Sequence, residues 1–251
     1  LPAVVRAVET DDDRGRRGVG LLYGANTLGA VTGCALANFF LLEIFGTRMT
    51  LWLAALLNLL IAVVARAFAR EMPDTEADEK LDPEAPVEAP AAPPGFVLAA
   101  AMIVGFSFFL MELVWYRMLG PILGGTIFTF GLILVVALAG IGLGGAFHGA
   151  LGRGRAATAS GFALTCVLEA ACFALAYAAG DRVATLAMAL RTTGAFGFSG
   201  LVAGWAVVAG VVVFPGAFIS GVQFPMLIAL LGKGRRGVGE QTARAYAANT
   251  V

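Results

Sequence analysis

Long apolar runs without interruption dominate this sequence of 251 residues. A helix needs about 20 apolar residues to cross roughly 30 Å of hydrocarbon, and inside lipid every backbone polar group must be satisfied within the segment. Because the runs are continuous and do not alternate, they predict helices and not the strands of a barrel. We expect the start of a seventh span near Ala243 and six complete spans, over residues 19–42, 48–69, 96–118, 126–150, 157–179 and 200–231.

The composition agrees with lipid as the main solvent. Hydrophobic residues make up 59% of the chain and charged residues 14%, outside the usual balance of a soluble domain. The 17 basic and 17 acidic residues cancel, which indicates no general attraction to nucleic acid. Cys34, Cys166 and Cys172 lie in apolar runs without a CxxC or Cys/His cluster, a pattern typical of buried thiols. We therefore expect the lipid bilayer as a partner, no nucleic acid, and no metal or other cofactor.

Two segments interrupt the regular pattern. Residues 71–94 contain eight acidic residues and many prolines, so they have no apolar face to bury and predict a mobile aqueous linker between 1–70 and 95–251. The run 200–231 is too long for one straight span and contains Pro215 and Pro225. Since proline removes a backbone donor, we expect this run to be kinked or broken.

The distribution of basic residues predicts the orientation of the chain. If each run crosses once, 13 of the 17 basic residues lie on one side of the membrane and 4 on the other. The positive-inside rule places the first side in the cytoplasm, together with the N-terminal residues and the acidic linker.

The two ends of the sequence repeat each other. "RRGVGLLYGANTLG" begins at Arg16, and "RRGVGEQTARAYAANTV" begins at Arg235. Three pairs of residues are each separated by 223 positions, namely Pro2 and Pro225, Tyr23 and Tyr246, and Asn26 and Asn249. The six expected crossings between the copies restore the orientation, so the duplication is parallel, as between the two six-helix halves of major-facilitator transporters. We expect 1–70 to hold helices five and six, 95–251 to hold helices seven to the start of eleven, and both ends to be truncated.

Three motifs carry a family resemblance. They are "ELVWYR" at Glu112–Arg117, similar to E-V-x-W-x-R; "GVQFPML" at Gly221–Leu227, similar to G-A-T-F-P-L-L; and "YGANTLGAVTG" with "YAANTV", similar to Y-A-A-N-T-x-G-A. In this order they resemble the membrane region of the fused major-facilitator/spermidine-synthase-like proteins of bacteria. Gln223 stands where that family usually has Thr. The soluble synthase-like domain of methyltransferase fold, into which such proteins usually continue, has no counterpart in this sequence.

The resemblance implies a fold, a location and partners. It implies an all-α, polytopic, major-facilitator-like protein of the bacterial inner membrane that handles a polyamine-related solute. It also implies a soluble synthase-like domain or partner membrane subunits. Whether the whole protein is an enzyme stays open, because no nucleophile–base pair or metal cluster is present in this sequence.

The string "GIGLGG" at Gly140–Gly145 looks like a nucleotide-binding fingerprint. Such a loop must follow a strand at an aqueous crevice, whereas this one lies inside an expected span. Gly140 and Gly144 therefore favour close helix packing. The pairs Gly29 with Gly33 and Gly200 with Gly204 invite the same interpretation.

Ionisable residues inside lipid are expensive and mark candidate sites. Glu112 precedes Arg117 by five residues, about 140° around a helix, so each seeks a partner elsewhere, in a structural ion pair or as a ligand group. Glu169 lies at the middle of its span, without a basic residue at its depth. Two interpretations of Glu169 compete. In the first it is a protonated carboxyl with a purely structural hydrogen bond, and in the second it is a binding site for a proton or a cation.

Several neutral or interfacial residues complete the set of candidates. Trp115 and Tyr116 favour anchoring at the membrane interface over a cation cage. Asn26 and Asn249 favour contacts between helices over a site between the halves. Gln223 lies beside Pro225, where a discontinuous helix would free backbone groups for a ligand.

Two functions compete at this point. In the first, a transporter-like domain handles a small cationic solute, and Glu112, Glu169 and Gln223 line a polar space that opens away from the cytoplasm. In the second, the chain is a structural anchor or subunit that positions a soluble catalytic domain or a partner complex.

Overall fold

The computed structural model describes residues 16–71, 91–151, 156–232 and 238–250, and every regular element in these ranges is helical. The contacts divide the chain into two units, which are Leu36–Glu88 and the combination of Leu1–Ala35 with Ala89–Val251. Of the repeated end segments, residues 1–15 lie outside the described ranges, and so does most of the acidic segment 71–94.

Five helical runs in the described ranges are long and apolar enough to cross a membrane: Arg17–Phe68, Pro94–Leu123, Ile127–Leu151, Ala159–Ala178 and Gly180–Leu231. They confirm the prediction of an all-α chain with several apolar spans. We expected six complete spans, and the difference arises because 19–42 and 48–69 fall within one run of 52 residues. At about 1.5 Å per residue, a straight helix of that length far exceeds one bilayer.

The smaller unit contains the break in that first run. A short π-helix, η1 (Ala37–Leu41), leads into α3 (Leu42–Glu71), in which Gly46 leaves the helical conformation with φ 67° and ψ 175°. Glycine takes such angles without the steric cost that a Cβ would impose. The side chains from 51 to 68 are all exposed, and Leu56, Leu59 and Ile61 are more than half exposed. This apolar helix surface suits lipid or another protein.

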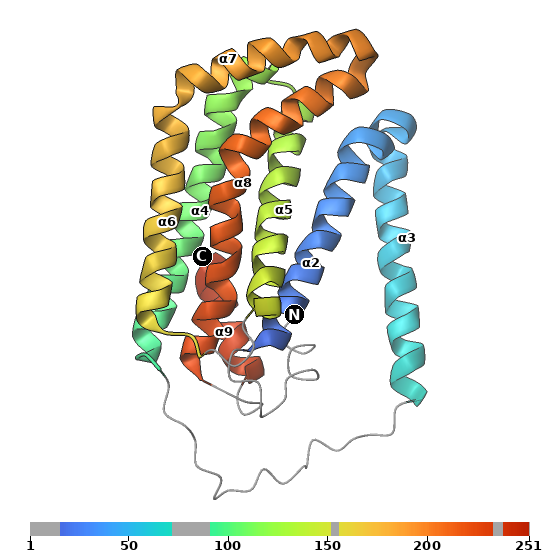
Figure 1. Ribbon diagram of the computed structural model, residues 1–251. Coiled ribbons are helices and arrows are strands. Elements are labelled where there is room, and N and C mark those ends of the chain that lie inside the picture. Colours follow the sequence, from blue (N-terminus) through green and yellow to red (C-terminus); the bar gives the residue numbers. More distant parts are fainter. Residues whose placement is uncertain (1–15, 72–90, 152–155, 233–237, 251) are drawn as a thin grey trace, which may run out of the picture. The chain divides into compact units, whose positions relative to one another are not determined.

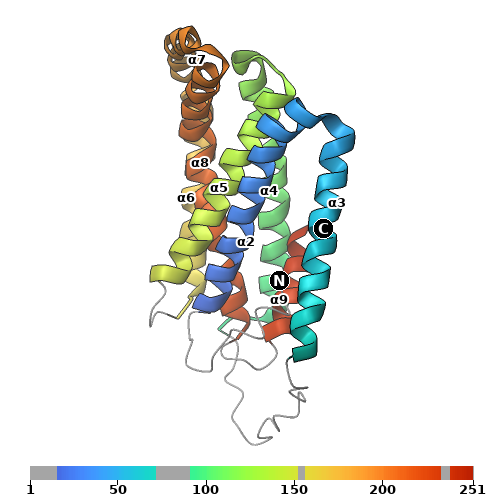
Figure 2. The same cartoon turned by 90° about the vertical axis from the view of Figure 1, so that its right-hand side faces the viewer.

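The larger unit is a helical bundle around α8 (Figure 1). Its elements are α2 (Arg17–Leu36), α4 (Pro94–Leu123), α5 (Ile127–Leu151), α6 (Ala159–Ala178), α7 (Gly180–Leu190), the 3₁₀-helix η2 (Arg191–Phe196), α8 (Gly197–Leu231) and α9 (Val238–Thr250). Helix α8 packs against α4, α5, α6, α7, η2 and α9. Figures 1 and 2 show α7 running across the ends of the long helices.

Small residues bring α5 and α8 close together. A Cβ added at Gly140 would lie 2.7 Å from the Cβ of Ala217, and one at Gly144 would collide with the carbonyl of Phe218. The packing interpretation of "GIGLGG" is therefore confirmed. Gly200 and Gly204 likewise face η2 and the end of α7, whereas Gly29 and Gly33 have no such neighbour within 4 Å in the described part of the chain.

Helix α8 is continuous and bent, so of the two expected alternatives, a kinked or a broken helix, the structure agrees with the first and contradicts the second. Its 35 residues remain helical with Pro215 and Pro225 inside, and Figure 1 shows it bending along its length. A proline removes one intrahelical hydrogen bond, and the helices packed around α8 keep it helical despite that loss.

Two further boundaries differ from expectation. Helix α4 does not end near residue 118 but continues to Leu123, with Pro121 in its last turn, and it ends at Gly124 in the left-handed conformation with φ 100°. Helix α7 was not predicted from the sequence. Its apolar residues Val183 and Ala187 are buried against the bundle, at the spacing of an amphipathic helix.

Candidate functional site

A buried polar pair joins α6 to α8. The Nε2 of Gln223 donates a hydrogen bond of 2.9 Å to the Oε2 of Glu169, and it lies 3.8 Å from the sulfur of Cys166. Glu169 is 6% exposed and Gln223 is fully buried. Ser220, three residues before Gln223 and so on the same face of α8, lies beside the Glu169 carboxyl. Two helices thus converge on one carboxyl group.

The pair lies between two apolar clusters of the larger unit. The first cluster includes Phe162 of α6 and Phe224 of α8. The second cluster includes Phe173 of α6 and Ala217 of α8. Along both helices, Glu169, Ser220 and Gln223 fall between these positions, so the polar groups form a narrow layer with apolar packing on both sides.

Two oxygen atoms in this layer have no hydrogen-bond partner. They are Oε1 of Glu169 and Oε1 of Gln223, and both are buried. A buried acceptor without a donor typically costs about 1–3 kcal/mol, and such atoms are uncommon in folded proteins. Both atoms are acceptors, so a proton, a cation or a ligand N–H group would satisfy them.

No fixed positive charge balances Glu169 from the two helices that build the site. The sequences of α6 and α8 contain no Lys, Arg or His. The titratable groups that interact electrostatically with Glu169 are the thiols of Cys166 and Cys172 on the same helix. The layer is therefore suited to a positive charge that comes from outside the two helices.

Glu112 lies in a different environment. It is half-buried on α4, and its electrostatic neighbour is Cys34 at the end of α2. In the described ranges, no hydrogen bond or ion pair joins Glu112 to Glu169, Gln223 or Arg117. The structure thus brings Gln223 to Glu169 but does not bring Glu112 to them.

Trp115 is enclosed in the second apolar cluster, so the expectation of an interfacial anchor was wrong for this residue. It is 1% exposed and makes edge-to-face contacts with Phe108 and Phe173, at ring-centroid distances of 5.8 and 5.6 Å. The reason is that the side of α4 that carries Trp115 packs against Phe173 of α6, which places the indole inside the bundle.

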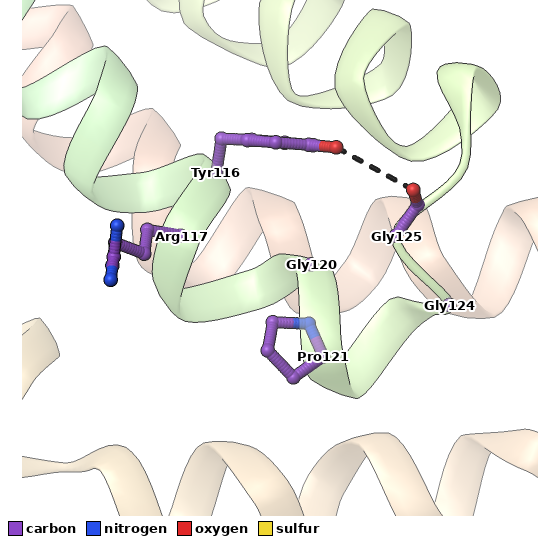
Figure 3. A pocket seen from close by; sticks show the side chains of 6 residues that line it. All are labelled: Tyr116, Arg117, Gly120, Pro121, Gly124 and Gly125. Carbon is purple, nitrogen blue, oxygen red and sulfur yellow. Dashed lines mark hydrogen bonds between the residues drawn. The ribbon is translucent and has the colours of Figure 1, made fainter.

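Tyr116 and Arg117 line an open pocket of about 430 Å³ at the C-terminal end of α4, with Gly120, Pro121, Gly124 and Gly125 (Figure 3). The hydroxyl of Tyr116 donates to the carbonyl of Gly125 at 3.5 Å, and Arg117 is exposed and points away from that contact. A neighbouring pocket of about 330 Å³ includes Arg191 and Trp205. Neither pocket is lined by Glu169 or Gln223.

The two repeated asparagines differ in their surroundings. The Nδ2 of Asn249 donates to the carbonyl of Ala101 at 2.9 Å and joins α9 to α4. The side chain of Asn26 is exposed on α2. The geometry thus gives Asn249 a contact between helices and gives Asn26 no enclosed environment.

Two polar groups at or near these contacts were not predicted from the sequence. The first is Ser220, although its hydroxyl, three residues before Gln223, was a usable signal. Arg16 is fully buried, and its Nη2 donates to Oε1 of Gln241 at 2.5 Å. Gln241 in turn donates to the carbonyl of Leu231, the last residue of α8, at 3.3 Å. The repeated "RRGVG" strings pointed to this region but not to the contact.

No protein-family model matches the chain, and it matches no curated protein and no solved structure.

Proposed function

We propose that the chain is a transporter-like membrane domain, of the spermidine-synthase-like type, that handles a small cationic, polyamine-related solute. The observation that carries this proposal is the buried Glu169–Gln223 pair, with one unmatched oxygen on each residue. A positive group beside these oxygens would offset the buried negative charge and supply the missing hydrogen-bond donors.

The proposal includes a major-facilitator-like arrangement, in which 1–70 ends the first half, 71–94 is a cytoplasmic linker and 95–251 begins the second half. The matched tyrosines support it, because Tyr23 and Tyr246 both pack on the ring of Phe224, at centroid distances of 4.9 and 6.0 Å. The charge distribution supports an orientation with the linker in the cytoplasm, in a bacterial inner membrane.

The alternative is a membrane anchor that positions a soluble synthase-like domain or partner membrane subunits. The apolar clusters on both sides of the Glu169–Gln223 layer favour it, because they enclose the carboxyl that Gln223 holds by a hydrogen bond. The exposed apolar surface of α3 also favours it, since a partner subunit would cover that surface.

Binding of spermidine to the protein in lipid nanodiscs tests the proposal. We expect Glu169→Gln to weaken binding by about tenfold or more, the effect of losing a charge-assisted hydrogen bond. The matched control is Glu240→Gln, because Glu240 is 67% exposed and pairs with Arg244 on the surface of α9. Equal affinities in wild type and Glu169→Gln, or no binding at all, would favour the anchor.

A further inference from the structure

We propose that Glu169 and Gln223 form a proton-binding site, in which one proton on Oε1 of Glu169 closes a cyclic acid–amide pair between α6 and α8. The inference concerns the same two residues as the proposed function and gives that function a coupling ion. It does not require that any solute is transported.

The geometry of the pair leads to this proposal. A carboxylic acid and a primary amide bind each other through two hydrogen bonds, one from the amide N–H to an acid oxygen and one from the acid O–H to the amide oxygen. The first bond is present, from Nε2 of Gln223 to Oε2 of Glu169 at 2.9 Å. The two atoms of the second bond are the two oxygens without a partner. One proton on Oε1 of Glu169 would supply the second hydrogen bond.

A carboxylate cannot complete the pair by itself. It only accepts hydrogen bonds, so in any orientation of the amide the oxygen of Gln223 finds no donor on an ionised Glu169. Protonation converts one carboxyl oxygen into a donor, and the other still accepts from Nε2.

The surroundings favour a proton over a larger cation. The pair lies between two apolar clusters, and neither pocket described above reaches it. A metal ion would need several ligands, and the described residues contain no group of three His, Cys, Asp or Glu side chains that could hold one. A proton needs no added volume.

The charged and titratable groups around the pair do not replace the proton. On α6 they are Cys166 and Cys172, which are neutral as thiols, and α8 has none. Helix α4, which reaches α6 through Trp115, carries Glu112, Tyr116 and Arg117. Glu112 is an acid beside Cys34, and Arg117 is exposed. The reaction is the transfer of one proton from a hydronium ion to the carboxylate, which yields a neutral acid and water.

Infrared difference spectroscopy of the protein in nanodiscs, titrated from acid to alkaline pH, tests the proposal. We expect a C=O band of a protonated, buried carboxyl that shifts in D₂O and disappears at alkaline pH. Glu169→Gln should remove this band, and Glu240→Gln, which changes an exposed acid, should leave it. Gln223→Leu should move the band to higher frequency, because the acid O–H loses its amide acceptor.

The variants separate loss of the proton site from a failure to fold and from loss of solute binding. Glu169→Gln should fold, because a second amide in place of the acid makes both hydrogen bonds with Gln223 without a proton. A folded wild type without any band that Glu169→Gln removes would overturn the proton site. A band that is present in a protein that binds no spermidine would contradict the proposed function and leave the proton site in place.

Discussion

Glu169 places a carboxyl group where lipid and apolar side chains offer it little solvation, and Gln223 supplies a hydrogen bond that water would otherwise provide. This hydrogen bond makes the layer specific for an acid or an amide at position 169. An apolar residue at position 169 would leave the buried Gln223 with only its contact to the sulfur of Cys166.

The first prediction compares two replacements of Glu169. We expect Glu169→Gln to be about as stable as wild type, and Glu169→Leu to lose about 1–3 kcal/mol, because leucine removes the carboxyl acceptor of Nε2 of Gln223 and leaves it only the weak contact with the sulfur of Cys166. Reversible unfolding in mixed detergent micelles measures the difference. Equal stability of the two variants would show that the hydrogen bonds contribute nothing to the fold.

At this scale the sequence predicted part of the site. Glu169 and Gln223 were each selected, because a polar group in an apolar run is expensive. They were expected to line one polar space, and the structure brings them together, but the particular bond from Nε2 to Oε2 depends on how α6 packs against α8 and was not predicted. The same limit explains Glu112, which was expected to join them: its position on α4 turns it toward Cys34 of α2.

Among the elements, the contact between α5 and α8 depends on residues without side chains. Gly144 lies against the backbone of Phe218 and Gly221. Gly210, also inside α8, has no such neighbour within 4 Å in the described residues. The two glycines therefore respond differently to the same substitution.

We expect Gly144→Ala to destabilise the protein by about 1–3 kcal/mol, because the added methyl group forces the two helices apart. Gly210→Ala should be neutral or stabilise by up to about 1 kcal/mol, since alanine is the better helix former. Thermal unfolding of both variants measures this contrast. A stabilised Gly144→Ala would contradict the close packing of α5 on α8.

The C-terminal end of α8 offers a third test. Gln241 accepts from the buried Arg16 and donates to the carbonyl of Leu231. We expect Gln241→Leu to speed amide hydrogen exchange in the last turns of α8 and in α9, because both contacts are lost together. Arg244→Leu, at an exposed position of α9, is the control. Unchanged exchange in Gln241→Leu would show that this contact does not hold the helix ends.

The helices themselves were largely predictable, since a long continuous apolar run in lipid satisfies its backbone hydrogen bonds only as a helix. The positions at which the helices end were less predictable. The end of α4 depends on Gly124 and not on the charge at Arg117, and α7 is too short and too polar to register as a span. The break at Gly46 separates the two runs that were predicted as individual spans.

For the whole molecule, the charge distribution predicts an orientation that a labelling experiment can test. In a background without native cysteines, Lys80→Cys should react with a membrane-impermeant thiol reagent only from the cytoplasmic side. Arg182→Cys, at an exposed position of α7, should react only from the other side. Labelling of both positions from the same side would contradict the proposed topology.

The most direct test of the account measures protons and solute together. If the Glu169–Gln223 pair binds either a proton or a cationic group, adding spermidine to the purified protein in weakly buffered nanodiscs should release protons. Wild type should acidify the solution in proportion to the spermidine bound, whereas Glu169→Gln should release no protons and bind weakly. Tight binding of spermidine without proton release, or equal release from both proteins, would contradict the central claim that this pair carries the exchangeable positive charge.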